Sequence, residues 1–300
     1  MPTDDSILDC LIIGGGPAGL VAAVYLGRFR RKVLLIDDGG SRLAMIPRTR
    51  NVIGFPEGIA GAELLERMRD HSARYGVPTE TGRVERLALA QDGTFEALAG
   101  ARLLRARKVL LATGARDVEP EIPGLAPSLK AGQVRYCPVC DGYETQGQRV
   151  GVLGREIHGL RESAFLAGFG NQVTWLSLGS QHAVSDADLA RLRKLGVRIA
   201  DREPRQIRCE AGRGVRVEMH DGQTLEFDML YPALGLVHAS QLASELGARA
   251  QEDGQLEVDG HLQTTIPGLY AAGDVVVGLN QINVAAGHAA MAATAIHNSL

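Results

Sequence analysis

Two cysteines and an acid stand together near the middle of the chain and are of types that carry redox chemistry. Cys137 and Cys140 are separated by two residues, and Asp141 follows directly. Such a pair can close a small disulfide, supply half of a metal site, or cycle between dithiol and disulfide. A zinc half-site has no need of the acid, whereas a sulfur that gains or loses a proton during thiol–disulfide exchange does. The acid therefore favours a redox-active pair.

The other two cysteines do not complete a metal site. Cys10 lies in an apolar run and Cys209 in an alternating stretch, and both stretches predict β-strands. Zinc prefers four ligands, and the sequence contains no second cysteine pair or histidine cluster. We therefore expect no metal, and we interpret Cys10 as a small core residue.

Length and composition set limits on the class of protein. A chain of 300 residues has room for two domains. Its 37 glycines and 4% aromatic residues are typical of an α/β protein with tight strand-to-helix turns around nucleotide phosphates. A net charge of -3 argues against nucleic acid or an anionic membrane as partner, and no apolar run is long enough to span a bilayer. The acidic first ten residues and the four cysteines predict a reducing, cytoplasmic location.

A nucleotide-binding pattern occupies the first 37 residues. An apolar run over residues 7–13 predicts a buried strand that ends in the turn 14–19, and a helix-like segment and a second strand over 32–36 follow. Gly14 permits the tight turn, Gly16 admits a pyrophosphate, and Gly19 lets the helix pack on the strand. Asp37, at the end of the second strand, suits a ribose diol. Pro17 and Ala18 complete the turn, whose helix N-terminus would face the phosphates.

Two distant stretches end in similar small-residue turns and carry a resemblance to a known family. Residues 109–115 predict a strand ending at Thr113 and Gly114, and residues 269–274 repeat that form and end at Gly273 and Asp274. With these motifs the chain resembles, over essentially its whole length, the low-molecular-weight thioredoxin reductase type of pyridine nucleotide–disulfide oxidoreductase. The resemblance implies an α/β fold of two Rossmann-like three-layer (ββα) nucleotide-binding domains, the second inserted into the first, and a homodimer.

The resemblance also implies a discontinuous FAD-binding domain and a role for particular residues in it. We expect this domain at 1–117 and 246–300, with a central NAD(P)-binding-like domain at 118–245 that carries the cysteine pair. In the family the Gly273–Asp274 pair reaches the ribityl chain and pyrophosphate of FAD. Gln281, with Ile282 beside it, matches a position at the isoalloxazine edge, and Asn51 resembles another flavin-side position. His288, in a predicted last helix over 284–296, is either a surface or subunit-interface histidine or a polar group near the flavin.

The resemblance implies different roles for the two cysteines and for the acid that follows them. Cys140 would be the sulfur nearest the flavin, Cys137 the interchange thiol that meets the partner, and Asp141 the acid/base. The family pattern places this segment at the opening of a helix, where unpaired amides favour thiolates. Pro138 removes one of those amides and fixes the local backbone.

The central domain departs from the family pattern at its nucleotide site. A strand over 149–154 leads into a turn in which Gly154 and Gly159 hold the first and last glycine positions, but Glu156 occupies the second. A carboxylate there is bulky and has the charge of the pyrophosphate it would meet. The basic cluster that clamps the 2′-phosphate of NADPH in the family is also missing, since residues 177–186 contain no lysine or arginine. These departures predict weak or absent NADPH binding.

The sequence therefore predicts an FAD-dependent thiol–disulfide oxidoreductase whose electron donor is ferredoxin or another carrier protein, a second flavin in the central domain, or some other source. Its partner would be a thioredoxin-like protein or a small-molecule disulfide or dithiol. Three alternatives stay open: a dithiol oxidase that uses oxygen, an NADPH-dependent thioredoxin reductase with an atypical site, and a non-catalytic flavin-binding module. The last gives no reason to keep both sulfurs and the acid.

Overall fold

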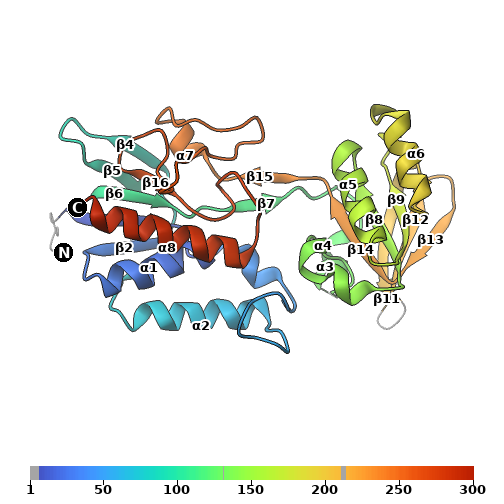
Figure 1. Ribbon diagram of the computed structural model, residues 1–300, viewed down its shortest axis with the longest axis horizontal. Helices are drawn as coiled ribbons and strands as arrows, with labels where there is room; N and C mark the ends of the chain where they lie inside the picture. Colours follow the sequence, from blue (N-terminus) through green and yellow to red (C-terminus); the bar gives the residue numbers. More distant parts are fainter. Residues whose placement is uncertain (1–6, 131, 211–213) are drawn as a thin grey trace. The chain divides into compact units, whose positions relative to one another are not determined.

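The chain folds into two compact units, seen in the computed structural model of Figure 1. The structure describes residues 7–130, 132–210 and 214–300. Unit 1 comprises Met1–Arg116 and Val237–Leu300, and unit 2 is the continuous insertion Asp117–Leu236. The chain crosses between them in β7 (Ala115–Asp117) and β15 (Leu236–His238), which pair with each other.

The second crossing comes earlier in the sequence than the expected boundary at residue 246. Ala239 donates its N–H to the Gly114 carbonyl oxygen at 2.9 Å and accepts the Thr113 hydroxyl at 2.6 Å. His238 Nδ1 lies 2.7 Å from the carbonyl oxygen of Asp274. These bonds join the stretch after the crossing to unit 1.

Unit 1 is built on a mixed sheet with the strand order β3-β2-β1-β6-β5-β4, and β16 also pairs with β6. The parallel strands are β1 (Leu8–Ile13), β2 (Val33–Asp37), β3 (Thr79–Thr81), β6 (Arg102–Leu111) and β16 (Leu269–Ala271). β5 (Phe95–Ala99) and β4 (Arg86–Leu89) extend it antiparallel. The long strand β6 pairs with β5 through its first half and with β16 through its second. Buried parallel strands explain the continuous apolar runs of β1 and β2.

Helices of unit 1 pack closely where their side chains are small. The helices are α1 (Pro17–Arg28), α2 (Gly61–Ala73), α7 (Gln241–Ser244) and α8 (Ile282–Asn298), with the 3₁₀ turn η1 (Arg42–Met45). α1 contacts both α2 and α8, and α8 runs alongside it in Figure 1. Ala22 and Ala23 of α1 and Ala289 and Ala292 of α8 are fully buried, which lets the two backbones approach.

Unit 2 has three layers, as expected. Its parallel sheet has the order β10-β9-β8-β14, from β8 (Arg149–Gly154), β9 (Gln172–Leu176), β10 (Arg198–Ala200) and β14 (Met229–Ala233). The antiparallel layer is β11 (Pro204–Glu210), β12 (Gly214–Met219) and β13 (Thr224–Phe227). The helices and 3₁₀ turns are α3 (Leu125–Lys130), α4 (Pro138–Asp141), η2 (Gly142–Thr145), α5 (Glu156–Ala167), η3 (Gln181–Ala183) and α6 (Asp186–Lys194).

Two apolar cores lie on the two faces of this parallel sheet. Val152 and Trp175 point to the core that α5 and α6 cover, and Leu153 and Leu176 point to the core shared with β11–β13. From its alternation of apolar and polar residues, the stretch 197–234 is expected to form one meander, and the structure shows that this expectation is wrong at both ends. β10 and β14 belong to the parallel sheet: β14 is a short, mostly buried apolar strand, and Ile199 and Ala200 of β10 are half-buried.

Among the described residues, no helix combines the length and the apolar character needed to cross a membrane.

Candidate active site

The first glycine turn of unit 1 packs so closely against backbone that neither Gly14 nor Gly19 can carry a side chain. Gly14 has a φ of 108° and donates to the Ile36 carbonyl oxygen at 2.8 Å. A Cβ at Gly14 would overlap the Ala112 carbonyl, and one at Gly19 would overlap the Gly14 carbonyl. Gly16 is different, because a Cβ there would meet only Ser41 Oγ, at 3.4 Å. The space beside Gly16, before the N-terminus of α1 and free of nearby backbone, fits a pyrophosphate.

Asp37 lies at the end of β2 and is buried. Its Oδ1 accepts the N–H groups of Gly15 at 3.0 Å and Gly39 at 3.2 Å, and Arg69 Nη2 lies 3.3 Å from Oδ2. The backbone bonds fix the carboxylate at the edge of the glycine turn, where the fingerprint places a ribose-binding acid.

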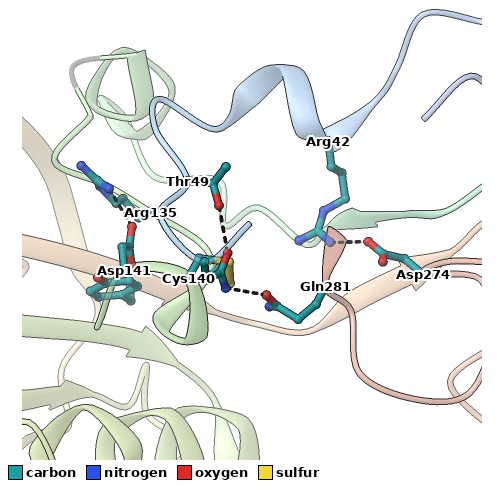
Figure 2. The surroundings of a disulfide bond; sticks show 10 residues. Arg42, Thr49, Arg135, Cys140, Asp141, Asp274 and Gln281 are labelled. Carbon is teal, nitrogen blue, oxygen red and sulfur yellow. Dashed lines mark hydrogen bonds and ion pairs between the residues drawn. A yellow bond between two sulfur atoms is a disulfide. The ribbon is translucent and has the colours of Figure 1, made fainter. Parts of the chain in front are cut away.

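The Gly273–Asp274 motif lies against the start of α1. Gly273 has a φ of 81°, and a Cβ there would come within 3.1 Å of the Ala18 Cβ. The Asp274 carboxylate accepts from Arg42 Nη1 at 2.9 Å, a pair that Figure 2 shows. Arg42 was not predicted, because its only signal in the sequence is a positive charge soon after Asp37.

Asn51 and Gln281 are brought together as expected for one site. Asn51 Nδ2 donates to Gln281 Oε1 at 2.8 Å, and Thr49 donates to Asn51 Oδ1 at 2.9 Å. Asn283 Nδ2 reaches the Asn51 carbonyl oxygen at 2.9 Å. These bonds tie the loop around residue 51 to the start of α8, where Ile282 packs against the core of unit 1. Neither Thr49 nor Asn283 was predicted.

His288 lies in α8 within electrostatic reach of Asp274. Burial lowers the pKa of the imidazole, and the Asp274 carboxylate acts in the opposite direction. Its Nδ1 is buried and has no hydrogen-bond partner within the described part of the chain. The lowered pKa keeps the ring neutral near physiological pH.

The cysteine pair of unit 2 is a disulfide. Cys137 and Cys140 are joined with their Cα atoms 5.3 Å apart, and Cys137 is the N-cap of α4, with Pro138 as its first residue. The expected helix is only four residues long and passes into η2, so its dipole gives the sulfurs little help. Cys10 is fully buried, and burial raises the pKa of its thiol, which fits the core role. No cluster of metal ligands occurs in the part of the chain that the structure describes.

The Asp141 carboxylate accepts a hydrogen bond at each of its two oxygens. Arg135 Nη1 donates to Oδ2 at 2.8 Å, and the Tyr231 hydroxyl donates to Oδ1 at 2.7 Å. Figure 2 shows the Arg135 contact. Asp141 was predicted from its place after Cys140, but neither donor was. Arg135 stands only two residues before Cys137, whereas nothing in the sequence around Tyr231 links it to the pair.

The turn of unit 2 at Glu156 forms its hydrogen bonds within the chain. Glu156 has a φ of 48°, in the left-handed region, and its N–H donates to Ser180 Oγ at 2.8 Å. The Ser180 hydroxyl in turn donates to the Ser177 carbonyl oxygen at 2.6 Å, and Ser177 Oγ donates to Asp201. The glycine at 154 is still needed, because a Cβ there would lie 2.8 Å from the Cα of Gly159.

Comparison with known proteins places the chain in a family. A family model described as pyridine nucleotide-disulphide oxidoreductase matches residues 8–289, and the chain belongs to this family. It is 30% identical to the thioredoxin reductase of Bacillus subtilis (strain 168), over 99% of this chain and 96% of that one. It is 28% identical to the thioredoxin reductase of Aquifex aeolicus (strain VF5), over 100% of this chain and 95% of that one.

The similarity extends to solved structures. The crystal structure of thioredoxin reductase from Streptococcus pyogenes MGAS5005 matches with a TM-score of 0.88 and 26% identity, over 98% of each chain. The protein is thus a flavin-dependent disulfide oxidoreductase, similar to the low-molecular-weight thioredoxin reductases, and the family implies FAD. The expected family and fold class are confirmed.

Proposed function

We propose that the protein moves electrons between FAD in unit 1 and the Cys137–Cys140 pair, and from there to or from a thiol substrate, without conventional use of NADPH. FAD supplies a centre that accepts or donates two electrons. The space beside Gly16, which no backbone atom occupies, and the fixed acid Asp37 support pyrophosphate and ribose binding. The other proposed FAD contacts are Gly14, Pro17, Ala18, Gly19, Asn51, Thr113, Gly114, Gly273, Asp274, Gln281 and Ile282.

The cysteine pair does its part by thiol–disulfide exchange. In the oxidising direction, a substrate thiol passes its proton to Asp141 as its sulfur attacks the Cys137 sulfur, the bond to Cys140 breaks, and Cys140 leaves as a thiolate. The second substrate thiolate then attacks the substrate sulfur of the mixed disulfide and releases Cys137. The substrate leaves as a disulfide, and the pair is left with both electrons. The half-exposed position of both cysteines supports this access, and Asp141 is the proposed proton acceptor.

One observation carries the proposal against NADPH: the Glu156 N–H donates to Ser180 Oγ. In a dinucleotide turn the second glycine lets the backbone touch the pyrophosphate. Here that position holds a carboxylate, and its amide is already satisfied by a side chain of the same unit. The stretch after β9 also offers no lysine or arginine for a 2′-phosphate between residues 177 and 186.

Stopped-flow mixing of the FAD-loaded protein with NADPH tests this directly. We expect no rapid loss of flavin absorbance at micromolar NADPH, whereas dithiothreitol or dithionite bleaches the flavin. Rapid bleaching by NADPH would overturn the proposal. The matched control adds dithiothreitol to a Cys137→Ser variant. If the flavin of this variant is no longer bleached, the electrons pass through the cysteine pair.

The same observation favours electron flow from dithiol to oxygen as a second candidate, because that direction needs no nicotinamide site. Hydrogen peroxide released in air upon addition of a dithiol would support the dithiol oxidase. Reduction of a thioredoxin-like protein by photoreduced ferredoxin would support the opposite direction, which the names of the relatives suggest. Two flavins per chain in the purified protein would support a second flavin as the donor.

A further inference from the structure

A short stretch before the cysteine pair is fixed to β14 by backbone pairing. Val134 forms a parallel bridge with Leu230. Leu230 N–H donates to the Gln133 carbonyl oxygen and Arg135 N–H donates to the Leu230 carbonyl oxygen, each at 3.0 Å. Val134 and Leu230 are both buried in the core shared with β11–β13. Because side chains alternate along extended backbone, Arg135 and the residue after Leu230 face the opposite side.

On that opposite side Arg135 and Tyr231 meet one carboxylate. Arg135 Nη1 lies 2.8 Å from Asp141 Oδ2, and its Nε donates to the Gly132 carbonyl oxygen at 3.1 Å. Tyr231 Oη lies 2.7 Å from Asp141 Oδ1. The Tyr231 side chain is fully buried, and only 10% of the Asp141 side chain is exposed. Each carboxylate oxygen therefore has its own donor, and each donor is held by the fold.

The tyrosine keeps its proton under all conditions in which thiols titrate. Burial raises the pKa of the Tyr231 phenol, and the charge of Asp141 adds to the effect. The hydroxyl is therefore a constant donor to the carboxylate.

We propose that Arg135 and Tyr231 are positioning residues that hold Asp141 for proton transfer at the Cys137–Cys140 pair. This inference rests on the proposed function, in which Asp141 is the proton acceptor. An incoming dithiol passes the proton of its first sulfhydryl to Asp141 as its sulfur bonds to Cys137. The Cys137–Cys140 bond breaks, and its electron pair stays on Cys140. Held at both oxygens, the carboxylate cannot rotate away from this task.

The test is the rate at which dithiothreitol opens the disulfide in the FAD-loaded protein, followed by thiol alkylation from mildly acidic to alkaline pH. Tyr231→Phe removes one hydroxyl and keeps the ring. We expect it to slow the reaction about tenfold, in line with loss of a hydrogen bond to a charged group. The rate–pH profile of each variant is recorded beside that of the wild type. Arg135→Gln should slow the opening of the disulfide to a similar extent. Arg135→Lys should keep part of the wild-type rate, because lysine retains the positive charge beside Asp141.

A double-mutant cycle separates positioning from general structural damage. Asp141→Asn alone should slow the reaction about 100-fold or more. If Tyr231 acts through Asp141, adding Tyr231→Phe to Asp141→Asn causes no further loss. Tyr143→Phe, on a ring that is 71% exposed, and Arg149→Lys, in the separate pair with Asp228, are matched controls that should keep the wild-type profile. The fluorescence of Trp175, the single tryptophan, reports whether each variant folds.

The results of these tests separate the positioning role of Arg135 and Tyr231 from the proposed proton-accepting role of Asp141. Wild-type rates and a wild-type pH profile in Tyr231→Phe would overturn the positioning role. So would a double variant in which the losses of Tyr231→Phe and Asp141→Asn add fully. In either case Asp141 would remain the proposed proton acceptor. Wild-type rates in Asp141→Asn would instead remove Asp141 from the proposed function. Arg135→Gln, at a residue outside the buried core, keeps the test decisive if Tyr231→Phe does not fold.

Discussion

Glu162 of α5 is a carboxyl group in an environment that disfavours its charge. Burial raises its pKa to about 8 from an ordinary value of 4.5, and the charge of Asp117 acts in the same direction. Its Oε2 is buried and accepts no hydrogen bond from any residue that the structure describes. The native state therefore retains a proton here that the unfolded chain releases at much lower pH.

This difference predicts a pH-dependent stability of unit 2. The contribution of Glu162 is fully present below about pH 4.5 and is lost as pH rises through about 8, because the folded state binds the extra proton in that window. Glu162→Gln should therefore match the wild type at acidic pH and be more stable at alkaline pH by about 1–2 kcal/mol, allowing for partial solvent access. Urea unfolding followed by Trp175 fluorescence measures this.

The control for that prediction is Glu203→Gln, which changes an exposed glutamate of the same unit. It should follow the wild-type curve at both ends of the pH range. A wild-type curve for Glu162→Gln as well would show that the carboxyl group titrates normally.

The roles of single residues could be predicted where the residue lies next to, or within, a recognisable sequence motif. Asp141 was recognisable because it follows Cys140, and Asp37 and Gly16 because they hold fixed places in one fingerprint. Tyr231 was not, because it lies 90 residues from Asp141, and only the parallel pairing of β14 brings them together. Pairing between distant segments leaves no local pattern in either of them.

The helix α5 shows how a changed residue alters the start of an element. In α1 the second glycine of the turn, Gly16, is the N-cap in an extended conformation, with φ of -80°. In α5 the corresponding Glu156 is the first helical residue, with a φ of 48°. Residues other than glycine avoid this region because Cβ crowds the carbonyl oxygen, at a cost of about 1–2 kcal/mol. The sequence showed the substitution at 156 but not the strained backbone or the Ser180 bond that accompanies it.

This strain predicts a difference between two variants that both remove the carboxylate. Glu156→Gly should unfold at higher urea concentration than Glu156→Ala, by about 1 kcal/mol in the free energy of unfolding, since they differ only in Cβ. Trp175 again reports on unit 2, because its Nε1 donates to the Gly154 carbonyl oxygen in this same turn, at 2.7 Å. Equal stability of the two variants would show that the turn relaxes into an ordinary conformation.

Strand type was predictable where apolar runs are uniform, as in β1, β2 and β8. Sheet membership was less so. β10 and β14 were assigned to a meander because they border alternating segments, yet they pair with the parallel strands. A short strand can pair in a parallel sheet or in an antiparallel meander, and the packing of the whole unit determines which of the two forms.

For the whole molecule, the insertion of one unit into the other leaves each with its own core. The split could be predicted because the first and last motifs belong to a single site. The second crossing could not be placed within several residues, because the bonds of Ala239 to Thr113 and Gly114 that fix it are long-range. Those bonds hold the two ends of unit 1 next to each other where the insertion begins and ends.

Unit 1 should therefore fold and bind FAD without the insertion. A chain that joins 1–116 to 237–300 through a short glycine–serine linker should hold about one FAD and show the flavin spectrum after gel filtration, because every proposed FAD contact lies in this unit. It should have no activity with dithiothreitol. Gly16→Val in the same chain is the matched control. It should fold, since Ser41 Oγ at 3.4 Å is the nearest atom to its Cβ, but lose the flavin because the side chain fills the proposed pyrophosphate space. A cooperatively melting fusion without flavin would show that residues of the insertion are needed to hold it.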